Sequence, residues 1–414
     1  MLDIHYIRDN LELVKTAAKN KNRQVDFEKL LKLDEDRKKL IAQTETLRAE
    51  RNTISSKHEA QNVERGKQIK EELKNLETKL RKIVTEFEQL MLTVPNVPDP
   101  SVPVGKDVSD NVEIKHWGEV PQFSFAPKDH LALAKELDLV DFERGVKVGG
   151  FRSYFLKNEA AQLELAVLFY TYQKLIGKGY TPLIAPSLVK DFTLFGNGQF
   201  PWGREEVYHL EKDDTYLAGT AEVPVTAYYA NEILQEKELP KKFVAFSPCF
   251  RREAGSYGKD TKGLYRLHQF NKIEQVIINS ADTKVSLELH EELLANAEEI
   301  LQDLQLPYRV LLMCTGDMGE PQVKKYDIET WMPSRSAYGE TMSNSFMGDF
   351  QARRLKIRYR NKEGKVQFAH TLNNTAVASP RILIAILENY QKADGSVSIP
   401  KVLQSLIGKD KIRR

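Results

Sequence analysis

Almost no cysteine and no long apolar run occur in this chain of 414 residues. Its two cysteines, Cys249 and Cys314, lie far apart without a metal-ligand spacing, so we expect neither a disulfide framework nor zinc. Because no stretch of about 18 apolar residues occurs, no membrane partner is expected. The opening residues, MLDIHYIRDN, lack the apolar centre of a secretory signal. These absences predict a cytoplasmic protein.

An excess of either charge is also absent. The chain has 61 Lys and Arg residues against 59 Asp and Glu, a net charge of +2, which argues against indiscriminate polyanion binding but leaves local basic faces open. The phosphate-binding pattern GxxxxGK[ST] is missing, so a nucleotide would need another kind of site. The length exceeds that of one typical core and predicts two domains.

Residues 27–92 contain no proline and one glycine, Gly66. Apolar residues recur there at spacings of three and four on both sides of a polar stretch over 55–65, after one short helix predicted near 9–19. The pattern predicts two helices of about 29 residues, each about 43 Å long, that fold back as an antiparallel coiled-coil arm in solvent.

The charge of this arm does not by itself identify a partner. It holds 15 Lys and Arg residues against 13 Asp and Glu, and coiled-coil hairpins often serve as spacers between proteins. An RNA contact stripe nevertheless stays open, formed by Lys29, Lys32, Arg51, Lys57, Arg65, Lys67 and Lys70.

Five prolines between positions 95 and 121 mark a sharp boundary. They predict an extended linker over 101–122, between an N-terminal domain at 1–100 and a second domain at 123–414. The second domain has a helix predicted over 158–177, strands near 215–224, 243–253, 264–278, 353–360 and 367–374, and a final helix over 381–391 before a basic tail. Strands without regular helix alternation favour an α+β fold with an antiparallel sheet.

The most informative segment is FRREAGSYGKDTKGLYRLHQFNKIE at 250–274, which is typical of a hairpin. Side chains alternate along a strand, so Arg251 and Glu253 would share a face, as would Arg266, Phe270 and Glu274. Arginine suits bidentate phosphate contact, and an aromatic ring stacks on a purine. We therefore predict a site for an anionic, planar, amine-bearing ligand. The alternative is a solvated hairpin whose charges pair across strands.

Two other segments carry polar side chains at strand spacing. Thr220 and Glu222 would share a strand face, where a hydroxyl and a carboxylate suit an α-amino group. Asn373 and Thr375 would share a face in the same way. The alternative for each pair is an ordinary exposed strand edge.

A third segment and a helix start suggest phosphate chemistry. Glu340 and Ser343 lie three residues apart and offer oxygen ligands for Mg²⁺, although this spacing also occurs in helix capping. Arg381 near a helix start opposes the helix dipole, which is tolerable where the side chain faces an anion. A plain surface arginine is the alternative.

These segments, in this order, resemble class II aminoacyl-tRNA synthetases and, more narrowly, the seryl-tRNA synthetase family. Residues 250–253 with Arg266 resemble motif 2 of the class, the stretch ending in Arg381 resembles motif 3, and the segment through Pro182 and Pro186 resembles motif 1. The narrower resemblance rests on TAE at 220–222, HQF at 268–270, GDFQARR at 348–354, ILENYQ at 386–391, the arm and the proline-rich stretch.

The sequence departs from the class pattern at a few positions. Ser379–Pro380 stands where glycine usually precedes the motif 3 arginine, and Asn374 replaces a common glycine. Met342 and Phe346 replace more usual polar residues beside the expected Mg²⁺ carboxylate. None of these departures removes a charged group.

The resemblance implies ATP-dependent activation of L-serine to seryl-adenylate and transfer of serine to tRNA(Ser), and also to tRNA(Sec) where present. It implies Mg²⁺, a homodimer, and an arm that lies on the long variable arm of the tRNA while the acceptor end enters the catalytic domain. The alternatives are a catalytically silent paralogue and a carrier-protein aminoacylating ligase. The retained motif arginines argue against the first, and the long arm argues against the second.

The resemblance also assigns residues. Glu253 would meet the adenine amino group, Phe270 would stack on the ring, and Arg266 with Arg381 would hold the γ-phosphate. Serine would be held by Thr220, Ala221, Glu222, Arg251, Glu274, Asn373 and Thr375. ATP would be held by Arg251, Arg252, Glu253, Arg266, Phe270, Glu340, Thr341, Met342, Ser343 and Arg381, and Mg²⁺ by Glu340 and Ser343.

Overall fold

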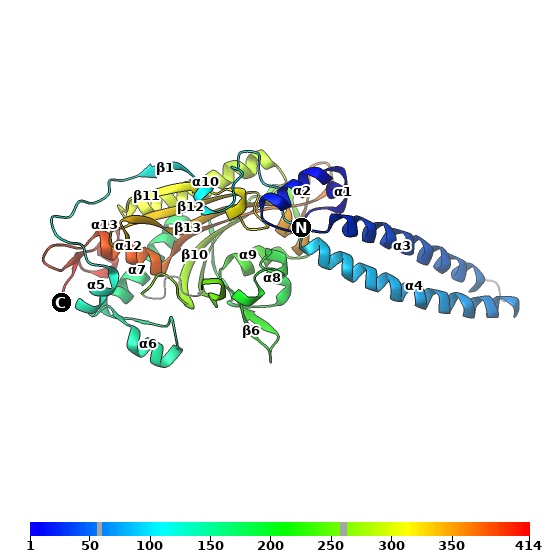
Figure 1. Cartoon of the computed structure of the whole chain (residues 1–414), viewed down its shortest axis with the longest axis horizontal. Coiled ribbons are helices and arrows are strands. Elements are labelled where there is room, and N and C mark those ends of the chain that lie inside the picture. The colour runs from blue at the N-terminus through cyan, green and yellow to red at the C-terminus, as the bar shows by residue number, and fades with distance from the viewer. Residues whose placement is uncertain (56–59, 257–262) are drawn as a thin grey trace. The chain divides into compact units, whose positions relative to one another are not determined.

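A computed structural model describes residues 1–55, 60–256 and 263–414 (Figure 1). The chain forms two compact units, residues 1–95 and 96–414. Among the described helices, none has both the length and the apolar character needed to cross a bilayer.

The N-terminal unit begins with two short helices, α1 (Ile4–Asp9) and α2 (Leu11–Asn20), where the sequence predicted one. The break comes at Asn10, whose non-helical backbone (φ −125°, ψ 38°) ends α1. The long helices α3 (Phe27–Ser55) and α4 (Ala60–Leu92) then form the predicted antiparallel arm (Figure 1).

A narrow apolar seam holds the arm together, with Leu30, Ile69 and Leu73 buried along it. Arg48 donates a hydrogen bond of 2.8 Å to Glu77 across the two helices. At the base, buried Asp34 pairs with Arg8 and Arg37 at 2.7 Å and with Lys38 at 2.9 Å. Burial opposes ionisation of Asp34, but these cations lower its pKa to about 2. The base is therefore a packed and charge-matched junction.

The second unit is built on an eight-stranded sheet in which only the β4–β9 pairing is parallel. This antiparallel α+β architecture confirms the predicted fold class. In spatial order the strands are β1 (Val112–Trp117), β11 (Tyr308–Leu312), β12 (Lys324–Met332), β13 (Ala337–Gly348), β16 (His370–Ala378), β10 (Gln269–Asn279), β9 (Lys241–Phe250) and β4 (Thr181–Ile184).

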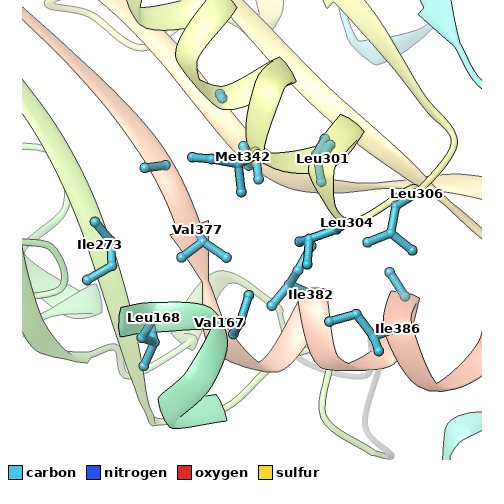
Figure 2. Packing of buried hydrophobic residues seen from close by; sticks show 14 of the residues in the cluster. Val167, Leu168, Ile273, Leu301, Leu304, Leu306, Met342, Val377, Ile382 and Ile386 are labelled. Carbon is cyan, nitrogen blue, oxygen red and sulfur yellow. The ribbon is translucent and has the colours of Figure 1, made fainter. Parts of the chain in front are cut away.

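Three amphipathic helices pack on this sheet: α7 (Asn158–Gly177), α10 (Thr283–Asp303) and α12 (Ser379–Asn389). Figure 2 shows Val167 and Leu168 of α7 near Ile382 of α12 and Ile273 of β10 in the shared core. Because neighbouring residues of a strand face opposite sides, burial of Ile273 in this core turns the adjacent Lys272 and Glu274 toward the other face. The core thereby orients the site residues of β10.

Smaller elements complete the unit. They are α5 (His130–Glu136), β2 (Val140–Asp141), α6 (Phe142–Gly149), β3 (Phe155–Leu156), β5 (Leu188–Val189), α8 (Asp191–Asn197), β6 (Tyr208–Leu210), β7 (Thr215–Leu217), α9 (Glu222–Thr226), β8 (Ile233–Gln235), α11 (Phe350–Leu355), β14 (Arg358–Arg360), β15 (Val366–Phe368), β17 (Val397–Ser398), α13 (Lys401–Ile407) and β18 (Lys411–Ile412).

Several sequence predictions need correction. Part of the predicted linker is strand β1, which pairs with β11 at the sheet edge. The predicted strand at 353–360 is mostly helix α11, which ends where Lys356 adopts a left-handed conformation (φ 55°). The basic tail KDKIRR contains β18, and α13 precedes it. The bounds of α7 were predicted correctly.

Candidate active site

A pocket lies above β10, β13 and β16. Its empty volume is about 550 Å³, which includes space open to solvent at the mouth. It collects residues that are far apart in the sequence. Nine residues predicted for ATP line it, together with Thr375 from the serine set: Arg251, Glu253, Arg266, Phe270, Glu340, Thr341, Met342, Ser343 and Arg381.

Residues 251–253 and 264–268 are not strand as predicted, because β9 ends at Phe250 and β10 begins at Gln269. Glu253 lies in a left-handed conformation (φ 55°), which breaks the alternation on which the prediction relied. Arg251 and Phe270 still meet, since the guanidinium carbon lies 5.3 Å from the ring centroid. The cation and the stacking surface therefore lie side by side in the pocket.

Glu253 faces two cations. Its Oε2 lies 3.2 Å from Arg266 and 3.8 Å from Arg152. Arg252, by contrast, does not line the pocket, and its guanidinium lies over the ring of Tyr208 at 5.7 Å. Of these residues, Arg152 comes from a part of the sequence that carried no signal for the site.

The carboxylate of Glu206 holds the chain that follows Glu253. It accepts hydrogen bonds from the backbone N–H groups of Ala254 at 3.1 Å and Gly255 at 2.6 Å. On the far side of residues 257–262, the backbone N–H of Leu264 donates to Nε2 of His130 at 3.3 Å, while Nδ1 of His130 contacts Glu388 at 3.0 Å. The sequence prediction missed both Glu206 and His130, because only tertiary contacts bring these two residues to motif 2.

Arg381 and Glu340 form the opposite wall. Arg381 donates to the backbone oxygen of Glu340 at 2.8 Å and to its carboxylate at 3.0 Å, and it lies 4.5 Å above the ring of Tyr265. Burial would raise the pKa of Glu340, but the charges of Arg381 and Lys325 outweigh it, so the pKa is lowered. The carboxylate therefore stays ionised.

A β-bulge explains how Glu340 and Ser343 share a side despite their spacing of three. The β12–β13 register pairs Asp327 with Ser343 but Glu329 with Glu340, so β13 carries one extra residue. Such a residue shifts the alternation of a strand. Glu340 and Ser343 thus present a charged carboxylate and a hydroxyl to the pocket, a donor set that suits Mg²⁺ sharing its remaining ligands with phosphate and water.

Among residues 1–55, 60–256 and 263–414, no group of three or more His, Cys, Asp and Glu side chains forms a metal cluster. Asp327 pairs with Ser343 across strands β12 and β13, and its carboxylate lies 3.0 Å from Lys325. Burial, opposed by Lys325, raises the pKa of Asp327 to about 7, so it is a weaker candidate for binding a cation than Glu340.

Glu274 is completely buried and lies behind two residues that line the pocket, Lys272 and Thr375, both of which contact it. Thr375 lies directly opposite it on β16 and donates to it at 3.4 Å. Asn373 donates at 3.2 Å, and Thr220 donates at 3.4 Å from the β7–α9 connection. Three of the predicted serine residues therefore meet around a fourth.

The prediction that Thr220 and Glu222 share a strand face is wrong. The backbone N–H of Glu222 bonds to the Thr220 hydroxyl at 3.1 Å, a local turn that leads into α9. Glu222 instead accepts hydrogen bonds from Asn197 at 2.8 Å and Gln351 at 2.9 Å. Burial, aided by the charge of Glu274, raises its pKa. Ala221 packs its methyl group in an apolar cluster, away from polar chemistry.

Among the pocket residues that the sequence prediction missed, Lys272 carries a charge. Lys272 lies on β10 between Phe270 and Glu274, and only 5% of its side chain is exposed. Its Nζ lies 2.7 Å from the Thr220 hydroxyl and forms an ion pair with Glu274. The signal was present, since positions 270, 272 and 274 follow the strand period of two.

The arm residues predicted for RNA differ in availability. Lys29, Lys32, Arg51, Lys67 and Lys70 are exposed. Arg65 is held by Glu50 at 2.8 Å and Glu72 at 3.0 Å. Lys57 lies outside the described residues.

Comparison with known proteins identifies the class. Residues 206–390 match the family model described as the tRNA synthetase class II core domain (G, H, P, S and T), and residues 1–98 match the seryl-tRNA synthetase N-terminal domain. The chain is thus a class II aminoacyl-tRNA synthetase. A serine--tRNA ligase of Deinococcus radiodurans is 48% identical over 99% of this chain and 98% of its own length.

Solved structures agree. Seryl-tRNA synthetase from Pyrococcus horikoshii, complexed with ATP, matches with a TM-score of 0.91 at 40% identity, covering 100% of this chain and 99% of that one. Cytoplasmic serine-tRNA ligase from Naegleria fowleri, in complex with AMP, gives 0.88 at 32% identity and the same coverage. The chain belongs to the seryl-tRNA synthetase family, and its activity is the charging of tRNA with serine. The family resemblance seen in the sequence is confirmed.

Proposed function

We propose that the chain activates L-serine with ATP to form seryl-adenylate and then transfers the seryl group to tRNA(Ser), and also to tRNA(Sec) where that tRNA is present. The observation that carries this proposal is a single pocket with two chemically distinct ends. Arg251 and Phe270 line a cationic and aromatic end, while Lys272 and Thr375 line the other, where both contact buried Glu274. The two similar structures are complexes with ATP and AMP, which supports a nucleotide in this pocket.

In this proposal the protein supplies position and charge, with no nucleophile of its own. The serine carboxylate attacks the α-phosphorus of ATP, pyrophosphate leaves, and a terminal ribose hydroxyl of tRNA then takes the seryl group. Arg251, Arg266 and Arg381 stabilise the phosphate charge. We assign Mg²⁺ to Glu340 and Ser343, where it would offset the charge of the phosphate oxygens.

Serine selection follows from burial of polar groups. Glu274 is buried against Thr375, which lines the pocket, and alanine bound there would leave a hydrogen-bonding partner of the missing hydroxyl unsatisfied. Sites built in this way reject the analogue by roughly 10⁴-fold or more. We therefore propose that selection occurs in the synthetic site itself.

Exchange of labelled pyrophosphate into ATP tests the activation step. Serine should support exchange and alanine should not, and removing Mg²⁺ with a chelator should stop it. A chain that supports no exchange with any amino acid would be a catalytically silent paralogue, and the proposal would fail.

We propose that the arm binds the long variable arm of tRNA(Ser) through its exposed lysines and Arg51. Arg48 of α3 and Glu77 of α4 lie side by side across the arm, joined by a hydrogen bond of 2.8 Å. A truncated enzyme can therefore be made by removing residues 49–76 and joining the two helices there with a short Gly-Ser turn. We expect kcat/KM for tRNA charging to fall by about 10²-fold or more, because the phosphate contacts are lost. Serine-dependent exchange should stay within about twofold of the full-length enzyme.

The two assays on the truncated enzyme separate the acceptors. A ligase that aminoacylates a carrier protein would not need the arm. Undiminished charging of tRNA by the truncated enzyme would therefore contradict the role proposed for the arm, while leaving the activation chemistry intact.

We further propose a homodimer in the cytoplasm. Apolar side chains near motif 1 are unusually exposed: Leu165 by 68%, Phe169 by 53% and Ile184 by 81%. Such a patch is typical of an interface, and the two free cysteines suit a reducing compartment. The mass of the protein in solution tests the dimer, and a monomeric mass would exclude it.

A further inference from the structure

The ammonium group of Lys272 sits among acceptors where the pocket borders buried Glu274. Its Nζ lies 2.7 Å from the hydroxyl oxygen of Thr220 and 3.4 Å from that of Thr375, and it is ion-paired with Glu274. The side chain of Lys272 is 5% exposed and that of Glu274 is 0% exposed. This end of the pocket therefore already holds a primary ammonium group.

An ammonium group has three N–H donors. Two hydroxyl oxygens and one carboxylate oxygen supply three acceptors, so the cluster is complete for one such group. Serine carries the same head group. Two ammonium groups cannot share these acceptors, because their like charges would meet in a desolvated site.

We propose that Lys272 is a placeholder: its ammonium group occupies the site of the serine ammonium group in the empty enzyme and is displaced when serine binds. This inference rests on the proposed function. Before serine arrives, Lys272 neutralises buried Glu274, which would otherwise be a costly unpaired charge. Once the ammonium group of serine takes over that task, Lys272 is released.

The position of Lys272 on the strand indicates where the released group goes. Phe270, Lys272 and Glu274 are successive residues on one face of β10, each separated from the next by about 7 Å. If the nucleotide base stacks at Phe270 and serine binds at Glu274, the serine carboxylate meets the α-phosphate between them. Lys272 lines the same pocket as Arg251, and its flexible stem lets the charge reach both anions. Lys272 thus helps bring the two anions together.

The probe for this exchange is 2-aminoethanol, which has the ammonium and hydroxymethyl groups of serine but no carboxylate. Lys272→Met keeps a linear stem and removes the competing charge. We expect the variant to bind 2-aminoethanol at least about tenfold more tightly than the wild type, measured as inhibition of exchange and by calorimetry. Its kcat for exchange should fall by about 10²-fold, because one cation at the reacting anions is lost.

The matched control is Lys242→Met. Lys242 lies on the neighbouring strand β9, outside the pocket, and pairs with Glu292 of α10 at 2.6 Å. This substitution should change neither value. Unchanged or weaker binding of 2-aminoethanol by Lys272→Met would overturn the placeholder role, as would an unchanged kcat. Absence of serine-dependent exchange in the wild type would instead overturn the proposed function.

A measurement on the wild type covers the case in which Lys272→Met does not fold. Amidination with ethyl acetimidate, followed by peptide mass spectrometry, reports the reactivity of Lys272 relative to Lys242. Saturating 2-aminoethanol should raise this ratio several-fold, because the displaced amine enters the open part of the pocket. A ratio that stays constant or falls would show that Lys272 remains in place and would contradict the proposal.

Discussion

Replacing Arg381 with alanine should lower serine-dependent pyrophosphate exchange by about 10³-fold. Its guanidinium lines the pocket, donates to Glu340 at 2.8 and 3.0 Å, and lies over Tyr265. Loss of one preorganised charge at a developing oxyanion costs about 10²–10³ in rate. The effect should lie at the upper end, because the same change removes a cation that holds Glu340 ionised.

The matched control for this prediction is Arg335→Ala. Arg335 lies 3.9 Å from the centroid of the same Tyr265 ring but is exposed and does not line the pocket. Its loss should leave exchange within a few-fold of the wild type. Binding of tRNA by Arg381→Ala should be unchanged. An Arg381→Ala enzyme with normal exchange would remove Arg381 from the proposed mechanism, whatever the control shows.

Glu274→Gln should lower kcat/KM for serine by about 10³–10⁴-fold, mainly through KM for serine. The carboxylate is fully buried, accepts hydrogen bonds from Thr220, Asn373 and Thr375, and pairs with Lys272. Glutamine keeps the size of the side chain but loses the charge, so an ammonium group loses its counterion in a desolvated site. KM for ATP should change by no more than a few-fold, because the nucleotide end of the pocket is untouched.

A buried carboxylate elsewhere separates recognition from folding. Glu298 is 5% exposed and pairs with Lys115 and Tyr308, outside the pocket. Glu298→Gln should reduce thermal stability about as much as Glu274→Gln does, while leaving KM for serine unchanged. If the two variants raised that KM equally, the effect of Glu274 would be a general loss of structure, and its assignment to serine would be wrong.

Local periodicity predicted the two arm helices and α7, but it did not identify α10 (Thr283–Asp303) or the break between α1 and α2. The spacing of apolar residues located α7 at its observed bounds and separated α3 from α4, since amphipathic helices record their buried face within a few residues. The bounds of strands next to irregular segments were predicted less accurately. Thr215–Leu217 alone is strand where the pattern suggested a strand to position 224, because a hydroxyl–backbone contact at Thr220 ends the alternation.

The candidate site was predicted in its residue types more than in its geometry. Phe270 and Glu274 were placed correctly on one face of β10, because alternation holds throughout that strand. Glu340 and Ser343 share a side through a bulge, which a pairing partner far along the chain creates. Lys272 was overlooked, since its position was visible in the sequence but its acceptors on β16 and at Thr220 were not.

The sequence by itself determined the helical arm and the set of charged motifs, because both depend on spacings within a short stretch of chain. It also determined the antiparallel character of the sheet, because the strands do not alternate regularly with helices. Only the tertiary structure decided which of these charges meet. Strand pairing across about 100 residues brings Thr375 opposite Glu274, and the fold removes water from the pair. Because a charge in a desolvated site requires a partner, buried Glu274 must be paired with one ammonium group, either that of Lys272 or that of serine.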